Sequence, residues 1–175
     1  MYKRQDLYLN NSIDTLFKFI KAKFKLTDKL YDIYGHSAGA QFVHRYLLMS
    51  DNPSVNRAVA ANAGWYTFLD GSNFPYGLSN PPINFNSSNV RDFLQMDFHV
   101  LIGSADTDIT SSVNQSNGAN NQGANRFQRA NNFFSYTQKI VDQNKLEFNW
   151  SFQIVNGVAH SNPRMSRAAA KILLD

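Results

Sequence analysis

Hydrophobic positions follow two alternating patterns along the chain. Short apolar runs at residues 30–34, 58–63 and 98–102, and an alternating run at 147–155, predict β-strands. Between them, apolar residues recur three or four positions apart, which predicts amphipathic helices at 12–25, 38–49, 127–141 and from 162 onward. Strands that alternate with helices are typical of a parallel sheet with helices on both faces. The pattern therefore predicts an α/β fold, with Asn125 and Asn162 as N-caps of the last two helices.

Two polar segments interrupt this pattern. Residues 64–89 are rich in Asn, Ser, Pro and Gly but contain six aromatic side chains. Because disordered linkers are poor in aromatic residues, we expect either an ordered pocket wall or lid, or a cluster that covers the sheet. Residues 108–125 are rich in Asn, Gln, Ser and Gly with few apolar residues, a composition typical of a mobile loop.

The string Gly35-His36-Ser37-Ala38-Gly39 lies between the first predicted strand and the helix that follows it. This G-x-S-x-G pattern is short, but a serine on a sharp strand-to-helix turn has its hydroxyl exposed above the sheet. We expect that a side chain at Gly35 or Gly39 would collide with the neighbouring strand or helix. The position of the pattern makes Ser37 a candidate nucleophile.

A serine hydroxyl needs a base to accept its proton, and the base needs an acid to orient it. Ser37, Asp106 and His160 each follow a predicted strand at its carboxyl end, where sites lie in parallel sheets. Asp108 is a second candidate for the acid, and its alternative role is to cap the turn. The remaining histidines are expected to be packed or hydrogen-bonded; they are His36, His44 and His99.

Residues 35–45 resemble the nucleophile-bearing turn of the α/β-hydrolase superfamily, and are most similar to bacterial esterases related to polyhydroxyalkanoate depolymerases. Further similar blocks occur in the same order at 62–66, 103–106 and 157–160, so the resemblance runs from about residue 10 to the end. It implies a serine ester hydrolase with a catalytic triad of Ser37, Asp106 and His160. No cofactor and no metal are expected.

The resemblance also implies the surroundings of the triad. The backbone N–H of Ala38 would be one oxyanion donor, and the second would come from the loop after an earlier strand. No His-Gly or Gly-Gly string occurs before Gly35 to supply it. Trp65 and Tyr66 are expected to shape the substrate pocket, with core packing as the alternative. The expected substrate is a small or polymeric ester; a peptidase of the same superfamily and a non-catalytic binding module remain alternatives.

The residues before the first strand are too few for a whole α/β-hydrolase. About 30 residues precede Tyr31, where the superfamily has several strands. We therefore expect residues 1–175 to form one domain that corresponds to the C-terminal half to two-thirds of the fold, with the first strand as an exposed edge. The missing strands would belong to a longer protein or to a second chain, or the family has a reduced form with a different second donor. Truncation is favoured.

The amino-acid composition excludes several further kinds of functional site. The chain has 43% hydrophobic residues, no cysteine and a net charge of +4. Disulfides, thiolate nucleophiles and cysteine-bound metals are excluded. Residues 1–6 lack a secretory signal and no run is long enough to span a membrane, so the compartment is not predicted. The lysines at 18–29 are interpreted as the solvated face of a helix, not as a nucleic-acid site; its core-facing stripe would be Ile13, Leu16, Phe17, Ile20 and Phe24.

Overall fold

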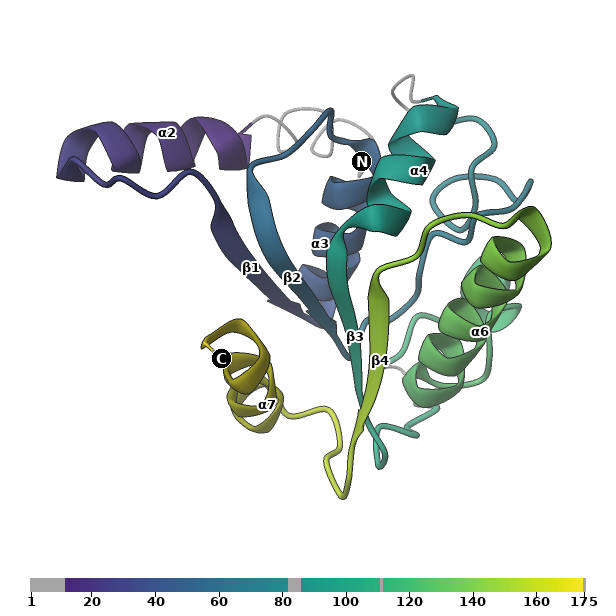
Figure 1. Cartoon of the computed structure of the whole chain (residues 1–175). Coiled ribbons are helices and arrows are strands. Elements are labelled where there is room, and N and C mark those ends of the chain that lie inside the picture. The colour runs from purple at the N-terminus through teal and green to yellow at the C-terminus, as the bar shows by residue number, and fades with distance from the viewer. Residues whose placement is uncertain (1–11, 82–85, 111, 175) are drawn as a thin grey trace.

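The computed structural model describes residues 12–81, 86–110 and 112–174. Its centre is a parallel four-stranded sheet in which the spatial order of the strands equals their order along the chain (Figure 1). The predicted strands are confirmed, although two of them begin about three residues away from the expected start. The strands are β1 (Tyr31–His36), β2 (Val55–Ala61), β3 (Asp97–Gly103) and β4 (Trp150–Val155).

Helices cover both faces of this sheet, as the sequence predicts. On one face α3, α4 and α6 pack against a large apolar cluster, and on the other α7 packs against a smaller one (Figure 1). The chain therefore has a three-layer α/β architecture. The helices are α2 (Ser12–Phe24), α3 (Ala38–Met49), α4 (Ser87–Gln95), α5 (Asn117–Asn120), α6 (Arg126–Asn144) and α7 (Asn162–Leu174).

Two helix starts differ from expectation. Helix α4 was not predicted, because its residues are mostly polar; its start is fixed by Asn86, whose side chain accepts hydrogen bonds from the backbone of Ser88 and Asn89. Asn162 is the first residue of α7 and not its cap, since the backbone N–H of Met165 donates to Ser161 O. The Asn162 side chain instead accepts a hydrogen bond from the Tyr34 hydroxyl at 2.8 Å, which ties α7 to β1.

The predicted core-facing stripe of α2 is confirmed at Ile13, which packs against the large apolar cluster, and is wrong for Leu16 and Phe24. No residue of α2 is buried, and Leu16 and Phe24 are 53% and 62% exposed. The helix is held near β1 through Asp14, which accepts a 2.9 Å hydrogen bond from Tyr31 Oη. Helix α2 lies near the start of β1, which is an edge strand of the described sheet (Figure 1). That a second chain or a further segment completes the sheet there stays a prediction.

The polar segment 108–125 is tied to the rest of the domain by a fully buried arginine of α6. The Arg129 guanidinium donates to Gly123 O at 2.8 Å and to Asn114 O at 2.9 Å, and reaches Gly64 O at 2.7 Å. Burial of this side chain lowers the pKa of Arg129. The segment also contains α5 and buries Val113. It is held by hydrogen bonds to Arg129, which its low apolar content did not indicate.

The two glycines of the G-x-S-x-G string have different environments. A Cβ atom on Gly35 would lie 2.2 Å from Gly39 O, closer than any real contact, so the expected collision is confirmed there. The same expectation is wrong for Gly39, where a Cβ atom would have nothing within 4 Å. The close approach of strand and helix therefore constrains only the first of the two glycines.

We expect Gly35→Ala to lower the free energy of unfolding by about 2–4 kcal/mol, because backbone atoms of α3 would have to move. Gly39→Ala is the matched control, and is expected to be neutral or to add up to about 1 kcal/mol through lower backbone entropy in the unfolded chain. Urea unfolding of both variants measures the difference. Equal effects at the two positions would contradict the described packing.

Candidate active site

Ser37 lies on the tight turn between β1 and α3, in a backbone conformation that few residues adopt. Its φ is 58° and its ψ is −116°, a region that is costly for any residue but glycine. Neighbouring backbone holds it there, since the N–H of Ser37 donates to Ala61 O at 2.9 Å and its carbonyl accepts from the N–H of Gln41 at 3.1 Å. The half-buried side chain stands at the carboxyl end of the sheet.

The three residues that the sequence singled out form one hydrogen-bonded chain. Ser37 Oγ lies 2.9 Å from His160 Nε2, and His160 Nδ1 lies 2.8 Å from Asp106 Oδ2. Because an ionised carboxylate only accepts hydrogen bonds, His160 Nδ1 carries the proton and Nε2 is free to accept from the serine hydroxyl. Asp106 is 1% exposed, whereas the His160 side chain is 30% exposed. The arrangement is open on the side of the serine.

Asp108, the alternative acid, lies in a different environment. Its carboxylate accepts hydrogen bonds from Ser112 Oγ at 2.7 Å and from the backbone N–H and hydroxyl of Thr110 at 2.8 Å. These bonds, that from Ser112 foremost, lower the pKa of Asp108 to about 2. The exposed side chain thus caps the turn after β3, and Asp106 is the carboxylate beside His160.

Arg126 is a site residue that the sequence analysis missed. Its guanidinium is 4% exposed and Nη1 lies 3.3 Å from Asp106 Oδ1, the oxygen that does not face His160. The backbone N–H of Phe127 donates to Asp106 O at 3.1 Å, so the start of α6 is fixed to the acid twice. No motif in the sequence links position 126 to position 106.

Asn62 is a second missed residue, although it begins one of the blocks that carry the resemblance. It is fully buried at the end of β2, where its Oδ1 accepts from Gly103 N at 3.0 Å and its Nδ2 donates to Ala159 O at 3.2 Å. Gly103 permits this close packing, because a Cβ atom there would lie 2.1 Å from Val158 O. Asn62 therefore joins the strand end that leads to Asp106 to the loop that carries His160.

The other three histidines are packed or hydrogen-bonded, as expected. The ring of His36 lies 4.6 Å from that of His160, and burial together with the charge of His160 lowers the pKa of His36 to about 4. His44 is fully buried and accepts from Thr67 N at 3.0 Å, which leaves its Nδ1 to donate to Ala40 O at 2.9 Å. Burial lowers the pKa of His44 to about 3. His99 bonds Ser151 Oγ through Nδ1.

The structure places the remaining candidate residues near the turn or in the core. Ala38 is exposed and is the first residue of α3, so its N–H has no acceptor within the helix. Tyr66 is fully buried and its ring stacks 4.4 Å from that of Phe133, so core packing accounts for it. Trp65 is 8% exposed and the guanidinium of Arg45 lies 4.8 Å from the centre of its ring. Their role in a substrate pocket stays a prediction.

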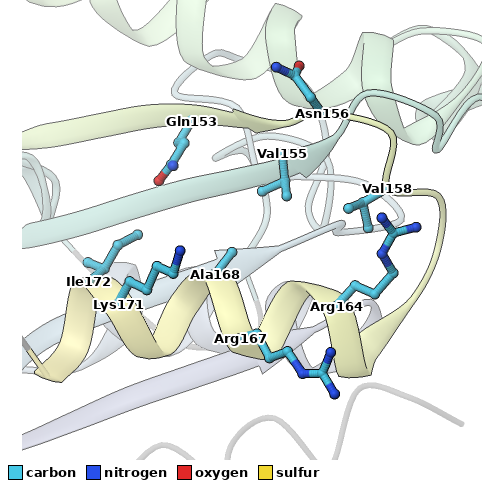
Figure 2. Close-up of a pocket in the computed structure, with 9 residues that line it drawn as sticks. All are labelled: Gln153, Val155, Asn156, Val158, Arg164, Arg167, Ala168, Lys171 and Ile172. Carbon is cyan, nitrogen blue, oxygen red and sulfur yellow. The ribbon is translucent and has the colours of Figure 1, made fainter.

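A groove of about 510 Å³ begins beside the loop that carries His160 and runs between β4 and α7 (Figure 2). Three cationic side chains of α7 line it together with apolar side chains, and no acidic residue is among the lining residues. Arg164, the first of these cations, donates to Gly157 O at 3.1 Å and lies next to Val158 in Figure 2. The other two cations are Arg167 and Lys171, and the apolar lining is Val155, Val158, Ala168 and Ile172.

Within the described ranges, no group of three or more His, Asp or Glu side chains is arranged to hold a metal ion. None of the described helices has the length and apolar character needed to cross a membrane.

The buried side chain of His44 predicts a loss of stability in mild acid. The pKa of His44 in the folded protein, about 3, lies below the ordinary value of 6.5, so the unfolded state binds a proton more readily. The contribution of neutral His44 to the free energy of unfolding is fully present above pH 6.5. It is lost as the pH falls toward 3, by about 1.4 kcal/mol per pH unit. Unfolding free energies at pH 6.5, 5.75 and 5 should therefore fall less steeply in His44→Gln than in the unsubstituted protein. Parallel slopes would contradict a neutral buried His44.

Known protein structures share this arrangement of strands and helices. Poly(aspartic acid) hydrolase-1 from Sphingomonas sp. KT-1 is 34% identical over 95% of this chain and 63% of its own, with a TM-score of 0.89. LpqC, a poly(3-hydroxybutyrate) depolymerase from Bordetella parapertussis, is 27% identical over 93% of this chain and 56% of its own, with a TM-score of 0.86. The chain thus spans about three-fifths of the length of these two proteins.

More distant structures agree in fold alone. The siderophore hydrolase EstB from Aspergillus nidulans is 14% identical over 97% of this chain and 58% of its own, with a TM-score of 0.53. No protein-family model matches the chain, and no curated protein matches it in sequence. Over the part of the fold that it spans, the chain therefore has an α/β-hydrolase-like fold, as its sequence predicts, and it is similar to a poly(aspartic acid) hydrolase and a poly(3-hydroxybutyrate) depolymerase.

Proposed function

We propose that this chain carries the active site of a serine hydrolase that cleaves carboxylic esters. The observation that supports this most strongly is the continuous hydrogen-bonded chain from Ser37 Oγ through His160 to Asp106. A serine in a tight turn, a histidine with its Nε2 available and a buried carboxylate are the parts that acyl transfer requires. The similarity to hydrolases over most of this chain supports the same class of reaction.

In the proposed reaction Ser37 Oγ attacks the ester carbonyl while His160 Nε2 takes the hydroxyl proton. The resulting tetrahedral intermediate collapses and the ester C–O bond breaks, with His160 returning the proton to the leaving alcohol. Water then attacks the acyl-enzyme by the same route and releases the acid and free Ser37. Asp106 accepts the Nδ1–H of His160 throughout, which holds the imidazole in the required tautomer.

The oxyanion of the tetrahedral intermediate needs donors that do not have to reorganise. We assign one of them to the backbone N–H of Ala38, because it is exposed next to Ser37 and lies at the positive end of the α3 dipole. The similarity to a poly(3-hydroxybutyrate) depolymerase makes small or polymeric hydroxyalkanoate-type esters the first candidate substrates. Of the two aromatic candidates, Trp65 is the proposed wall of the acyl or alcohol pocket, and the fully buried Tyr66 packs behind it in the core.

The two neighbouring aspartates offer a matched test of the triad. We expect Asp106→Asn to lower kcat for a p-nitrophenyl ester by about 10³–10⁴, because the amide no longer holds the His160 tautomer. Asp108→Asn removes the same charge two residues away and is expected to change kcat less than about threefold, since exposed substitutions have small effects. Equal losses of kcat in the two variants would contradict the assignment of Asp106 as the acid of the triad.

Ser37→Ala separates catalysis from binding. We expect the variant to lose ester hydrolysis while its free energy of unfolding remains close to that of the unsubstituted protein. If the folded unsubstituted protein shows no turnover on any ester and Ser37→Ala binds the same esters equally well, the alternative of a non-catalytic binding module is supported instead.

A second candidate function is cleavage of amide bonds in an anionic polymer. The 34% identity to a poly(aspartic acid) hydrolase favours it, and so does the groove beside the His160 loop, because its lining side chains include three cations and no acid. The same serine chemistry acts on amides as on esters. A polymer chain that carries carboxylates could lie in this groove while one of its bonds reaches Ser37.

This candidate predicts a charge effect that depends on the substrate. The double variant Arg167→Gln/Lys171→Gln should raise KM for poly(aspartic acid) about tenfold at low salt and leave KM for a neutral ester unchanged. The control variant Lys18→Gln/Lys25→Gln removes the same amount of positive charge. Lys18 lies in α2 and Lys25 directly follows this helix, before the start of β1 and therefore away from Ser37. Equal changes in the two double variants, or no cleavage of poly(aspartic acid), would exclude the groove as a site for this polymer.

A further inference from the structure

Helix α6 begins with a buried arginine that contacts the acid of the site from the side opposite His160. Arg126 Nη1 lies 3.3 Å from Asp106 Oδ1, while His160 Nδ1 lies 2.8 Å from Oδ2. A second guanidinium nitrogen of Arg126 donates to Ser112 O, so the side chain spans from the acid to the segment that follows it. With 4% exposure, Arg126 is shielded from solvent in a way that surface ion pairs are not.

We propose that Arg126 is a positioning residue for the reaction, which fixes the orientation of Asp106. This inference rests on the proposed serine hydrolase function. The carboxyl group of an aspartate rotates broadly about its Cβ–Cγ bond. A hydrogen bond to His160 through one oxygen leaves that rotation partly free, and a donor on the other oxygen removes the freedom. Arg126 therefore keeps Oδ2 directed at His160 Nδ1.

The tautomer of His160 depends on the direction of Asp106 Oδ2. The charged groups that face His160 are Asp106 from the loop after β3 and, through Asp106, Arg126 from α6; the titratable ring of His36 from β1 lies against it. From α7, Arg164 is bonded to Gly157 O in the same loop. Only a neutral imidazole with its hydrogen on Nδ1 can accept the proton of Ser37 at Nε2, and the bond to Asp106 Oδ2 selects that tautomer.

The hydrogen bond from Arg126 to Ser112 O also links the position of residues 112–120 to the candidate site. Arg126 holds Ser112 O, and the neighbouring Arg129 holds Asn114 O from the same helix. A displacement of residues 112–120 would move the start of α6 and, with it, the donor on Asp106. Arg126 is thus a direct side-chain connection between this polar segment and the candidate triad.

The test compares Arg126→Gln with Arg126→Lys by two readouts. The first is the NMR signal of the proton on His160 Nδ1 in the folded protein, assigned with a His160→Gln variant. In Arg126→Gln the Asp106 carboxylate is freer to rotate, so this signal should broaden or move upfield as the hydrogen bond to Oδ2 weakens. Arg126→Lys keeps a cationic donor beside Oδ1, so its signal should change less than that of Arg126→Gln.

The second readout is the split between kcat and KM for a neutral ester. Arg126→Gln should lower kcat about 10- to 100-fold with KM nearly unchanged, since the residue does not touch the substrate. Lysine cannot bond both Asp106 and Ser112 with a planar fork, so Arg126→Lys should lower kcat about three- to tenfold. If Arg126→Gln does not fold, an unchanged kcat in Arg126→Lys still overturns the proposal.

The outcomes separate this inference from the function on which it rests. A weakened or shifted His160 Nδ1 proton signal in Arg126→Gln, with no ester turnover by any form of the protein, supports the role of Arg126 and contradicts the hydrolase function. Normal turnover by the unsubstituted protein, with the same proton signal and the same kcat in folded Arg126→Gln, contradicts the role of Arg126 and leaves the hydrolase function intact.

Discussion

A carboxylate that is 1% exposed can keep its charge only if donors surround it, and Asp106 receives them from both layers of helices. His160, on the loop between β4 and α7, meets one oxygen; Arg126, at the start of α6, meets the other. Helices α7 and α6 lie on opposite faces of the sheet (Figure 1). The ion pair and the hydrogen bond therefore fix the two layers to each other at the carboxyl edge of the sheet, where Ser37 stands.

The order of the strands creates a distance that the loops have to cover. Ser37 follows β1 and His160 follows β4, the two edges of the described sheet, and three strand spacings amount to about 14 Å. The loop after β4 must therefore cross back over the ends of β3 and β2. Asn62 holds Ala159 at the end of β2, and Gly103 lets Val158 O approach β3 closely enough for this path. The 2.9 Å contact between Ser37 and His160 depends on both residues.

Much of the fold and the members of the candidate triad could be predicted from the sequence, because each depends on a local pattern. The strands are short apolar runs, and Ser37, Asp106 and His160 each follow one of them. Arg126 and Asn62 could not be found in this way, because their partners lie far away in sequence and share no spacing with them. The exposed apolar face of α2 and the space at Gly39 were also missed, because both depend on what packs nearby and not on periodicity.

We propose that Ser37, His160 and Asp106 act together as an activated nucleophile in this chain. The most direct measurement is the intact mass of the folded protein after treatment with a fluorophosphonate, with the modified residue located by peptide mapping. We expect one adduct, on Ser37, that disappears in Ser37→Ala and forms far more slowly in His160→Gln. An unmodified protein that is demonstrably folded, or an adduct on another residue, would contradict it.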